Sequence, residues 1–271
     1  MIYLNINEFM AYKPKIGLTM RLELETGRFY LGRDYSEAVE AAGGVPVHIP
    51  LIPNSEFMTS VVADLDGILL PGCDSDVDPK YYDEDPHPKL GNVVPEKDET
   101  DLLVLAEVER LHIPLLAICY GMQVLNVSRG GSLIQDIEAQ VENCIKHQQG
   151  KPAARNSHQI RIESDSLLSE IVDGVNAGKS LIVNSHHHQA IRKTGNDLRA
   201  VAWANDGVVE GIQDVRSDRF VLGVQWHPEL SWRTDSLSRG IFEVFVSRCS
   251  DSSKRRRDVA EGKVAVVPSS V

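Results

Sequence analysis

The chain has 271 residues, of which 42% are hydrophobic, and a formal net charge of -11 at pH 7. The hydrophobic content suffices for a packed core, and the negative charge argues against nucleic acids and anionic membranes as partners, because both would repel it. The four cysteines are widely spaced and match no zinc pattern, the N-terminus does not resemble a signal peptide, and no apolar run approaches the length of a membrane span. These features predict a soluble, cytoplasmic protein with free thiols.

The first half of the chain predicts strands that alternate with helices. The expected strands are residues 15–20, 45–49, 67–70 and 115–118. The expected helices are residues 35–42, 58–64, 98–111 and a segment that begins at Tyr120 and ends near Gly130-Gly131. A long polar loop, about residues 75–95, interrupts this order, and loops of that length are usually functional or mobile. The βαβαβαβα order is typical of a parallel sheet with helices on both faces.

After Ser132 the pattern changes to short strands joined by turns. The expected strands are residues 158–162, 180–184, 198–203, 208–213 and 220–224, and a final helix is expected at 236–246. The predicted fold class is therefore α/β, a mostly parallel central sheet flanked by helices with extra strands in the C-terminal half. Residues 1–250 are expected to form one domain. Residues 251–271, with the basic run Lys254–Arg257, are interpreted as a disordered, solvated tail, and a targeting signal is the alternative.

One stretch combines a strand with a helix that follows at once. The apolar run Leu115–Ile118 stops at Cys119, and helical spacing begins at Tyr120. Ala117 and Gly121 leave room for the sharp bend that this requires, which is the geometry of a nucleophile elbow with Cys in place of Ser. The helix N-terminus favours a thiolate there, and the Tyr120 N–H points where an oxyanion could form. The alternative is an ordinary buried cysteine.

A second polar stretch ends another expected strand with His227-Pro228-Glu229. A histidine that acts as a base needs a fixed tautomer and orientation, and a carboxylate on its other ring nitrogen supplies both. This pattern is consistent with a His227–Glu229 pair in a catalytic site. The alternative is a surface His-Pro turn with a solvated glutamate.

Three adjacent histidines, His186, His187 and His188, invite a metal interpretation. Successive strand residues face opposite ways, so only His186 and His188 could share a face. No Cys or Asp/Glu cluster with ligand spacing lies nearby. We therefore expect no metal and interpret this segment as a loop that contributes polar groups to a pocket.

These stretches together resemble the class I glutamine amidotransferase-like proteins, and within them the gamma-glutamyl-gamma-aminobutyrate hydrolase group, peptidase family C26. The motifs that carry the resemblance are L-D-G-I-L-L-P-G at 65–72, I-C-Y-G-M-Q-V-L-N-V at 118–127, V-N-S-H-H-H-Q-A at 183–190, D-G-V-V-E at 206–210 and G-V-Q-W-H-P-E at 223–229. The likeness covers about residues 14–248. It implies the flavodoxin-like class I glutamine amidotransferase fold, with antiparallel strands added in the C-terminal half.

The resemblance implies a catalytic triad in which Cys119 attacks a gamma-glutamyl amide, His227 transfers protons and Glu229 holds His227, with no cofactor. It places the oxyanion between the Tyr120 N–H and an N–H of the Pro71–Cys73 loop. The residues implied at these supporting sites are Gly72, Cys73 and Tyr120 around the oxyanion, and Gln123, His186, His187 and His188 around the substrate. The chain departs from the family pattern at Cys73, where many relatives have Gly, and at Tyr120, where the hydrolase group often has Arg.

The predicted function is cysteine-dependent hydrolysis of gamma-glutamyl amides, which releases glutamate and an amine. The family expectation for the small-molecule substrate is gamma-glutamyl-GABA, from putrescine catabolism, and the sequence allows a homodimer. One alternative is a glutaminase subunit that supplies ammonia to a separate synthase partner. Another is a catalytically silent binding protein on the same scaffold.

Overall fold

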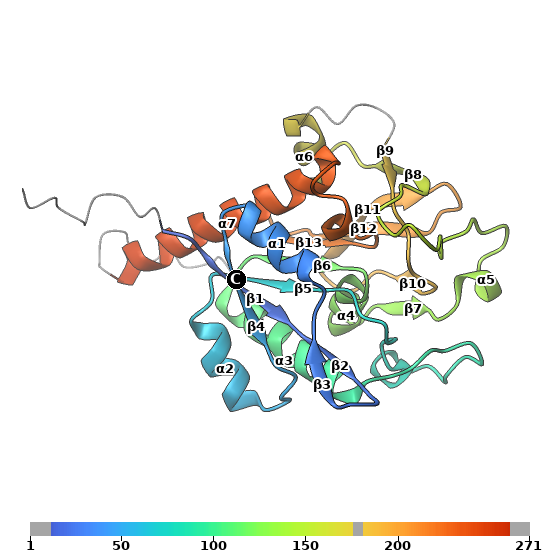
Figure 1. Cartoon of the computed structure of the whole chain (residues 1–271), viewed down its shortest axis with the longest axis horizontal. Coiled ribbons are helices and arrows are strands. Elements are labelled where there is room, and N and C mark those ends of the chain that lie inside the picture. The colour runs from blue at the N-terminus through green and yellow to red at the C-terminus, as the bar shows by residue number, and fades with distance from the viewer. Residues whose placement is uncertain (1–11, 176–180, 261–271) are drawn as a thin grey trace, which may run out of the picture.

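The computed structural model describes residues 12–175 and 181–260, and its centre is a nine-stranded sheet in the order β4-β1-β5-β6-β13-β12-β11-β8-β9 (Figure 1). The strands are β1 (Lys15–Thr19), β4 (Val45–Ile49), β5 (Gly67–Leu70), β6 (Leu115–Ile118), β8 (His158–Ile162), β9 (Leu181–Val183), β11 (Leu198–Ala204), β12 (Val209–Asp214) and β13 (Val221–Val224). From β4 to β13 neighbouring strands pair in parallel, and from β13 to β9 they pair antiparallel. The predicted α/β fold class is confirmed.

Helices cover both faces of the sheet (Figure 1). On one face α6 and α1 pack against α7, and on the other α3 packs between α2 and α4. The helices are α1 (Arg33–Ala41), α2 (Ser55–Ala63), α3 (Pro95–Leu111), α4 (Tyr120–Ser128), α5 (Ile137–Gln140), α6 (Leu167–Val175) and α7 (Ser236–Ala260). None of the helices in the described ranges is both long and apolar enough to cross a bilayer.

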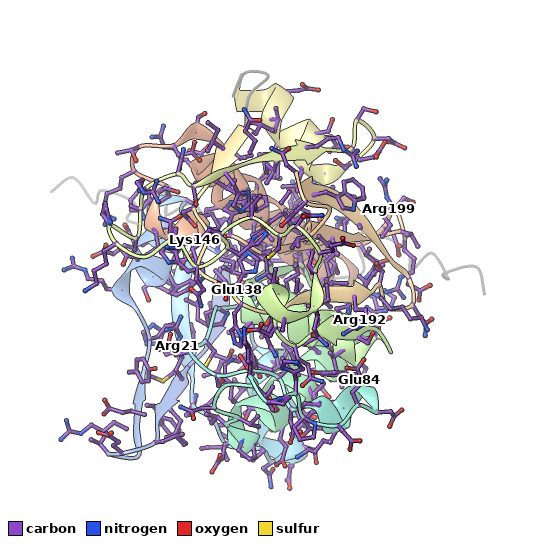
Figure 2. All side chains as sticks on the ribbon, turned by 90° about the vertical axis from the view of Figure 1, so that its right-hand side faces the viewer. Arg21, Glu84, Glu138, Lys146, Arg192 and Arg199 are labelled. Atoms are coloured by element: carbon purple, nitrogen blue, oxygen red, sulfur yellow. The ribbon has the colours of Figure 1, made fainter. Side chains whose placement is uncertain are left out.

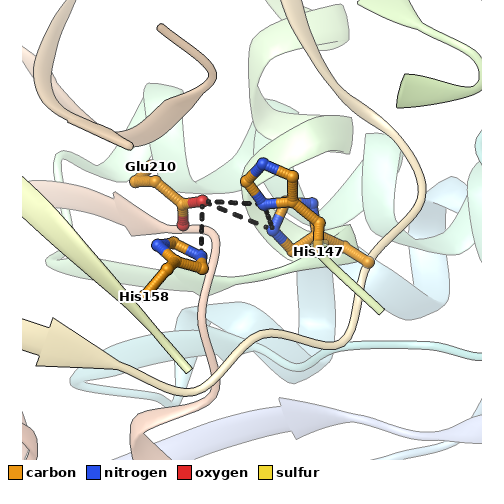
Figure 3. A group of neighbouring side chains, drawn as sticks. His147, His158 and Glu210 are labelled. Carbon is orange, nitrogen blue, oxygen red and sulfur yellow. Dashed lines mark hydrogen bonds and ion pairs between the residues drawn. The ribbon is translucent and has the colours of Figure 1, made fainter. Parts of the chain in front are cut away.

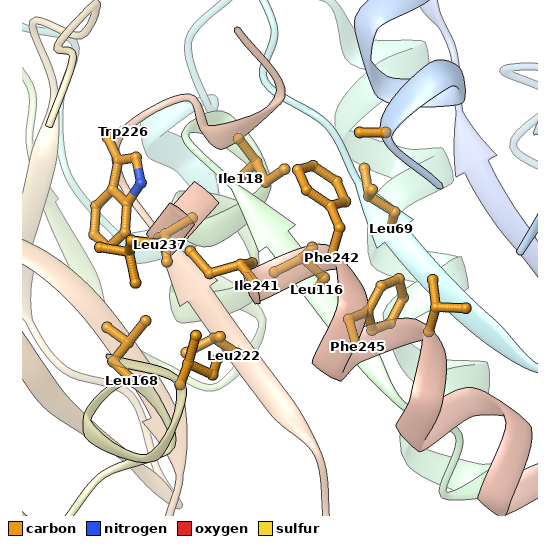
Figure 4. Packing of buried hydrophobic residues seen from close by; sticks show 14 of the residues in the cluster. Leu69, Leu116, Ile118, Leu168, Leu222, Trp226, Leu237, Ile241, Phe242 and Phe245 are labelled. Carbon is orange, nitrogen blue, oxygen red and sulfur yellow. The ribbon is translucent and has the colours of Figure 1, made fainter. Parts of the chain in front are cut away.

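The central strands are buried on both faces, as their uninterrupted apolar runs predict. Leu69 and Leu116 belong to the core layer beneath α7, where Phe242 and Phe245 also lie (Figure 4). Their chain neighbours point the other way, toward the layer beneath α2, α3 and α4. The packing of α7 onto β5 is so close that a Cβ added at Gly67 would overlap Cys249 Sγ.

Helix α7 is longer than the sequence indicated, and the expectation of a disordered tail from residue 251 was wrong for residues 251–260. The physical reason lies in contacts with distant segments. Arg256 Nη2 donates to the backbone oxygen of Leu65 and to Asp66 Oδ1, both at 3.0 Å, and Arg257 lies over the Tyr12 ring. The basic run therefore anchors the helix against the start of β5. The rest of the predicted tail lies outside the described residues.

Several short elements were not expected. They are the strand pair β2 (Arg21–Glu23) and β3 (Arg28–Tyr30), the pair β7 (Ser132–Ile134) and β10 (Ala190–Lys193), helices α5 and α6, and the 3₁₀ turns η1 (Pro79–Tyr82) and η2 (Pro228–Leu230). Strands β2 and β3 are three residues each and mostly exposed, so they carry no hydrophobic alternation. The long polar loop contains η1 and is closed at its ends by a bridge between Asp76 and Val93.

Candidate active site

Cys119 occupies the bend between β6 and α4, as the sequence predicts. Its backbone has φ 52° and ψ -108°, a strained conformation for a residue other than glycine. Its N–H donates to the oxygen of Val224 on β13 at 2.8 Å. A Cβ added at Gly121 would overlap the backbone oxygen of Leu70 on β5, so only glycine fits at that position. The bend presents the thiol at the carboxyl edge of the sheet, at the N-terminus of α4.

His227 reaches the same edge because β6 and β13 are parallel neighbours, with Ile118 paired to Val224. His227 Nδ1 lies 2.7 Å from Glu229 Oε1, and Glu229 is 2% exposed. The pairing predicted from the His-Pro-Glu motif is therefore present. The side chain of Asn184 holds the His227 backbone from both sides, since its Nδ2 donates to the His227 oxygen and its Oδ1 accepts from the His227 N–H, both at 2.8 Å.

Electrostatics favour a charged His227. Burial alone would lower its pKa, but the negative charges of Glu229 and Cys119 and their hydrogen bonds outweigh burial and raise the pKa to about 10. At neutral pH the His227 ring is therefore an imidazolium beside the Cys119 sulfur. A cation in this position stabilises the negative charge of a cysteine nucleophile.

Gly72 lies against both of these residues. A Cβ added at Gly72 would come within 2.7 Å of His227 Cε1 and 3.4 Å of Cys119 Cβ, so a side chain at this position would push into the pair. The absence of a side chain at residue 72 thus lets the loop after β5 close over the site.

The oxyanion prediction needs one correction. The Gly72 N–H donates to the Tyr35 hydroxyl at 3.0 Å and is therefore engaged. The Cys73 N–H makes no hydrogen bond to any described residue, and the Tyr120 N–H, at the first position of α4, has no acceptor within the helix. Cys73 and Tyr120 remain as the two candidate donors, and the Cys73 side chain does not remove its N–H.

Tyr35 and Arg21 support this loop and were not identified from the sequence. Arg21 Nε donates to the Gly72 oxygen at 2.6 Å, and Arg21 Nη2 lies 3.4 Å from the Tyr35 hydroxyl. Burial raises the pKa of Tyr35 well above its usual value, and the charge of Glu229 adds to this shift. Tyr35 therefore stays neutral. Both residues come from segments far from the motifs, and only the three-dimensional fold brings them to Gly72.

A cavity of about 300 Å³ opens beside Cys119. The site lies at the carboxyl end of β5, which points to the right in Figure 1. Figure 2 views the molecule from that side, and Arg21, Lys146 and Arg192 are labelled there. The predicted site residues that line the cavity are Cys73, Cys119, Tyr120, Gln123, His186, His187 and His188. A larger hollow of about 650 Å³, near Arg216 and Arg219, contains none of the predicted site residues.

The predicted substrate-binding residues differ in what their side chains do. Gln123 is 4% exposed, and its Nε2 donates to the Gln189 backbone oxygen and to Gln225 Oε1, both at 3.2 Å. His188 Nε2 lies 2.8 Å from Asp76 Oδ1, and this hydrogen bond raises the pKa of His188. Gln123 therefore braces the cavity wall, and His188 brings to it a ring whose pKa is raised.

The neighbouring histidines diverge. His186 Nε2 lies 2.9 Å from the Ala153 oxygen, so the pair His186 and His188 does not converge on a metal. The His187 side chain is 1% exposed, and its ring faces Glu210 and His147 in the interior. His187 is among the residues that line the cavity, as expected for this loop, while its ring is directed to the interior.

Comparisons with known proteins agree with this geometry. Residues 15–229 match the model of the peptidase C26 family. Gamma-glutamyl-gamma-aminobutyrate hydrolase PuuD of Escherichia coli is 33% identical over 250 residues, which cover 89% of this chain and 96% of that protein. Protein NtpR of Enterococcus hirae is 35% identical over 218 residues, which cover 80% of this chain and 88% of that protein.

A solved structure shares the fold. It is the crystal structure of a Thermoplasma acidophilum protein provisionally assigned as a GMP synthase subunit. It superposes with a TM-score of 0.62 at 17% identity and covers 91% of this chain and 99% of its own. The family match and the relatives confirm the sequence-based resemblance, and the solved structure confirms the fold.

Gly121→Ala tests the crowding at the bend. We expect a loss of about 1–3 kcal/mol in the free energy of unfolding, because the new methyl group would overlap the Leu70 carbonyl. Denaturant titration followed by circular dichroism measures this loss. The matched control is Gly174→Ala in α6, where an added Cβ meets open space and stability should hold or rise. Equal effects of the two substitutions would contradict the packing described for Gly121.

The protonation of His227 can be measured by NMR with ¹³C-labelled histidine. We expect its ring signal to show no titration between pH 6 and 9, because its pKa is raised to about 10. Since this folded-state value exceeds that of the unfolded chain, the charge stabilises the protein at neutral pH, and this contribution is lost as the pH rises through about 10.

Removing either negative neighbour provides the control. Glu229→Gln and Cys119→Ala should each lower the pKa of His227 and bring its titration toward neutral pH. A wild-type His227 that titrates near pH 6.5 would contradict the raised pKa.

Proposed function

The chain belongs to the peptidase C26 family, and from this premise we propose that it hydrolyses gamma-glutamyl amides with Cys119 as the nucleophile. One observation carries the proposal. A thiol at a strained strand-to-helix bend lies beside a histidine held at 2.7 Å by a buried carboxylate, and it opens into a cavity of about 300 Å³. The cavity volume lies at the lower end of the range for small-molecule sites, which suits a substrate of amino-acid size.

The first half of the reaction forms a thioester. The Cys119 sulfur attacks the side-chain carbonyl carbon of the gamma-glutamyl group, and the carbonyl electrons move to the oxygen. The N–H groups of Cys73 and Tyr120 stabilise this oxyanion. When the intermediate collapses, the C–N bond breaks, and the proton on His227 Nε2 passes to the departing amine.

The second half releases glutamate. His227, now neutral, takes a proton from a water molecule, and the hydroxide attacks the thioester carbon. The C–S bond breaks and restores the Cys119 thiolate beside the His227 imidazolium, and the new carboxylic acid of glutamate releases its proton to the departed amine or to solvent. Glu229 keeps the His227 ring oriented through both halves and stabilises its positive charge.

Gamma-glutamyl-GABA is the finer substrate proposal. It is supported by the Escherichia coli relative, whose name specifies that hydrolysis and which aligns over 96% of its own length. The walls of the cavity bear charge of both signs, since Asp74 and Asp76 line it together with His188, whose raised pKa favours its cationic form. Such walls suit the ammonium and carboxylate groups of a glutamyl moiety.

Glutamate release from a panel of gamma-glutamyl amides tests the function. The panel contains the GABA conjugate, glutamine, a gamma-glutamyl dipeptide and a polyglutamate. We expect release from at least one conjugate, and Cys119→Ala should lower kcat/KM by about 10,000-fold or more, because the thioester route is lost.

The matched control is Cys144→Ala, which removes a thiol that lines no part of the cavity and should keep wild-type activity. Full activity of Cys119→Ala would overturn the proposed nucleophile. Release from glutamine alone, and only with a second protein added, would replace the hydrolase proposal with a glutaminase subunit.

A further inference from the structure

A second cluster of titratable side chains lies inside the antiparallel half of the fold. Its members are His147, His158 at the start of β8, His187 after β9, and Glu210 on β12 (Figure 3). Their side chains are at most 6% exposed, and Glu210 is fully buried. One donor atom from each residue lies within 4.8 Å of all the others. None of the four residues has a role in the reaction proposed for Cys119.

The outward nitrogen of each ring already has an acceptor. His147 Nε2 lies 2.9 Å from Asp206 Oδ2, and His187 Nδ1 lies 2.9 Å from the Gln189 oxygen. His158 Nδ1 lies 3.2 Å from the Gln159 oxygen. Each acceptor requires a proton on the ring nitrogen that faces it. A neutral ring then carries its lone pair on the opposite nitrogen, which points into the cluster.

The interior of the cluster is therefore rich in acceptors. The Glu210 oxygens and His158 Nε2 make no hydrogen bond within the described chain, whereas His147 Nδ1 has the Ser185 hydroxyl at 3.5 Å and His187 Nε2 at 3.2 Å. Buried acceptors without donors are costly, and acceptors that point at one another also repel. A cation at their centre satisfies all four. Imidazole nitrogens whose second nitrogen is bound by a carboxylate or backbone carbonyl are the usual arrangement around a metal ion.

Four of the six distances between the donor atoms match the edges of a tetrahedron, and the two from His158 Nε2 to the other rings lie within 4.8 Å. Glu210 Oε1 lies 3.4 Å from each of His147 Nδ1, His158 Nε2 and His187 Nε2. His147 Nδ1 lies 3.2 Å from His187 Nε2. A tetrahedral Zn²⁺ with ligands at about 2.0–2.1 Å has its ligand atoms about 3.3–3.4 Å apart.

We propose that His147, His158, His187 and Glu210 bind one structural Zn²⁺ ion. Three imidazoles and one carboxylate suit zinc, and four protein ligands in a buried setting leave no coordination position for a substrate. The run of adjacent histidines in the sequence does not reveal this cluster, because its members His147, His158, His187 and Glu210 lie 11, 29 and 23 positions apart along the chain.

The ion would hold the loop that supports the catalytic residues. The Gln189 oxygen accepts from His187 Nδ1 and also from Gln123 Nε2, which braces the cavity wall. Three residues before His187, Asn184 grips the His227 backbone. A metal ion bound to His187 would therefore restrain the segment 184–189, which contacts the cavity wall at Gln189 and the His227 backbone at Asn184.

Zinc analysis of the purified full chain tests the proposal. The protein is stripped with a chelator, incubated with Zn²⁺, desalted and analysed by mass spectrometry of metals. We expect one Zn²⁺ per chain, and we expect stripped protein loaded with Co²⁺ to show the visible absorption of a tetrahedral site. Glu210→Gln and His158→Ala should lose the metal, whereas His48→Ala, which removes an exposed histidine outside the cluster, should keep it.

Folded wild-type protein that retains no zinc would overturn the proposal and leave a cluster held together by shared protons. Equal zinc retention in wild type, Glu210→Gln and His158→Ala would also overturn it, because the ion would then lie elsewhere. If either variant fails to fold, the test rests on the melting temperature of the wild-type protein with and without zinc. This temperature should fall on chelation and return with Zn²⁺, and an unchanged value would count against a structural ion.

Discussion

The bend at Cys119 is the constraint on which the rest of the site depends. A positive φ at a residue with a side chain is unfavourable, and here it persists because the surroundings leave no other path. Gly121 sits against the Leu70 carbonyl, and the Cys119 N–H is tied to Val224 on the adjoining strand. Strands β5 and β13, which flank β6, thus both hold the turn in place. The thiol is positioned by the sheet itself, before any substrate arrives, and this is the preorganisation that catalysis requires.

Two buried glutamates, Glu229 and Glu210, carry negative charge inside the fold, and histidine rings lie against both. Glu229 orients His227 in the parallel half of the sheet, and Glu210 faces three rings in the antiparallel half. Asn184 joins the two regions, because it follows β9 at the edge of the sheet and reaches across to the His227 backbone. The added antiparallel strands therefore contribute to the candidate active site as well as extending the sheet. They carry the loop that sets the position of His227.

The sequence predicts best what is local. The runs 67–70 and 115–118 are strands as expected, because residues buried on both faces must all be apolar, and Cys119 and His227 follow strand ends that the motifs mark. What it misses depends on distant contacts. Helix α7 continues because Arg256 meets Asp66, and Tyr35 serves the site because it meets Gly72. The histidine cluster has no local signature at all, since its ligands come from four separate segments.

The contact between α7 and β5 has a consequence for how this sequence can diverge. Cys249 Sγ fills the space that a side chain at Gly67 would need, although the two residues are 182 positions apart in the chain. Neither position can accept a larger residue alone, because protein interiors have no spare volume there. The two positions should therefore covary in evolution. A larger residue at position 67 on the strand requires a smaller one at position 249 on the helix, and related chains should show both changes together.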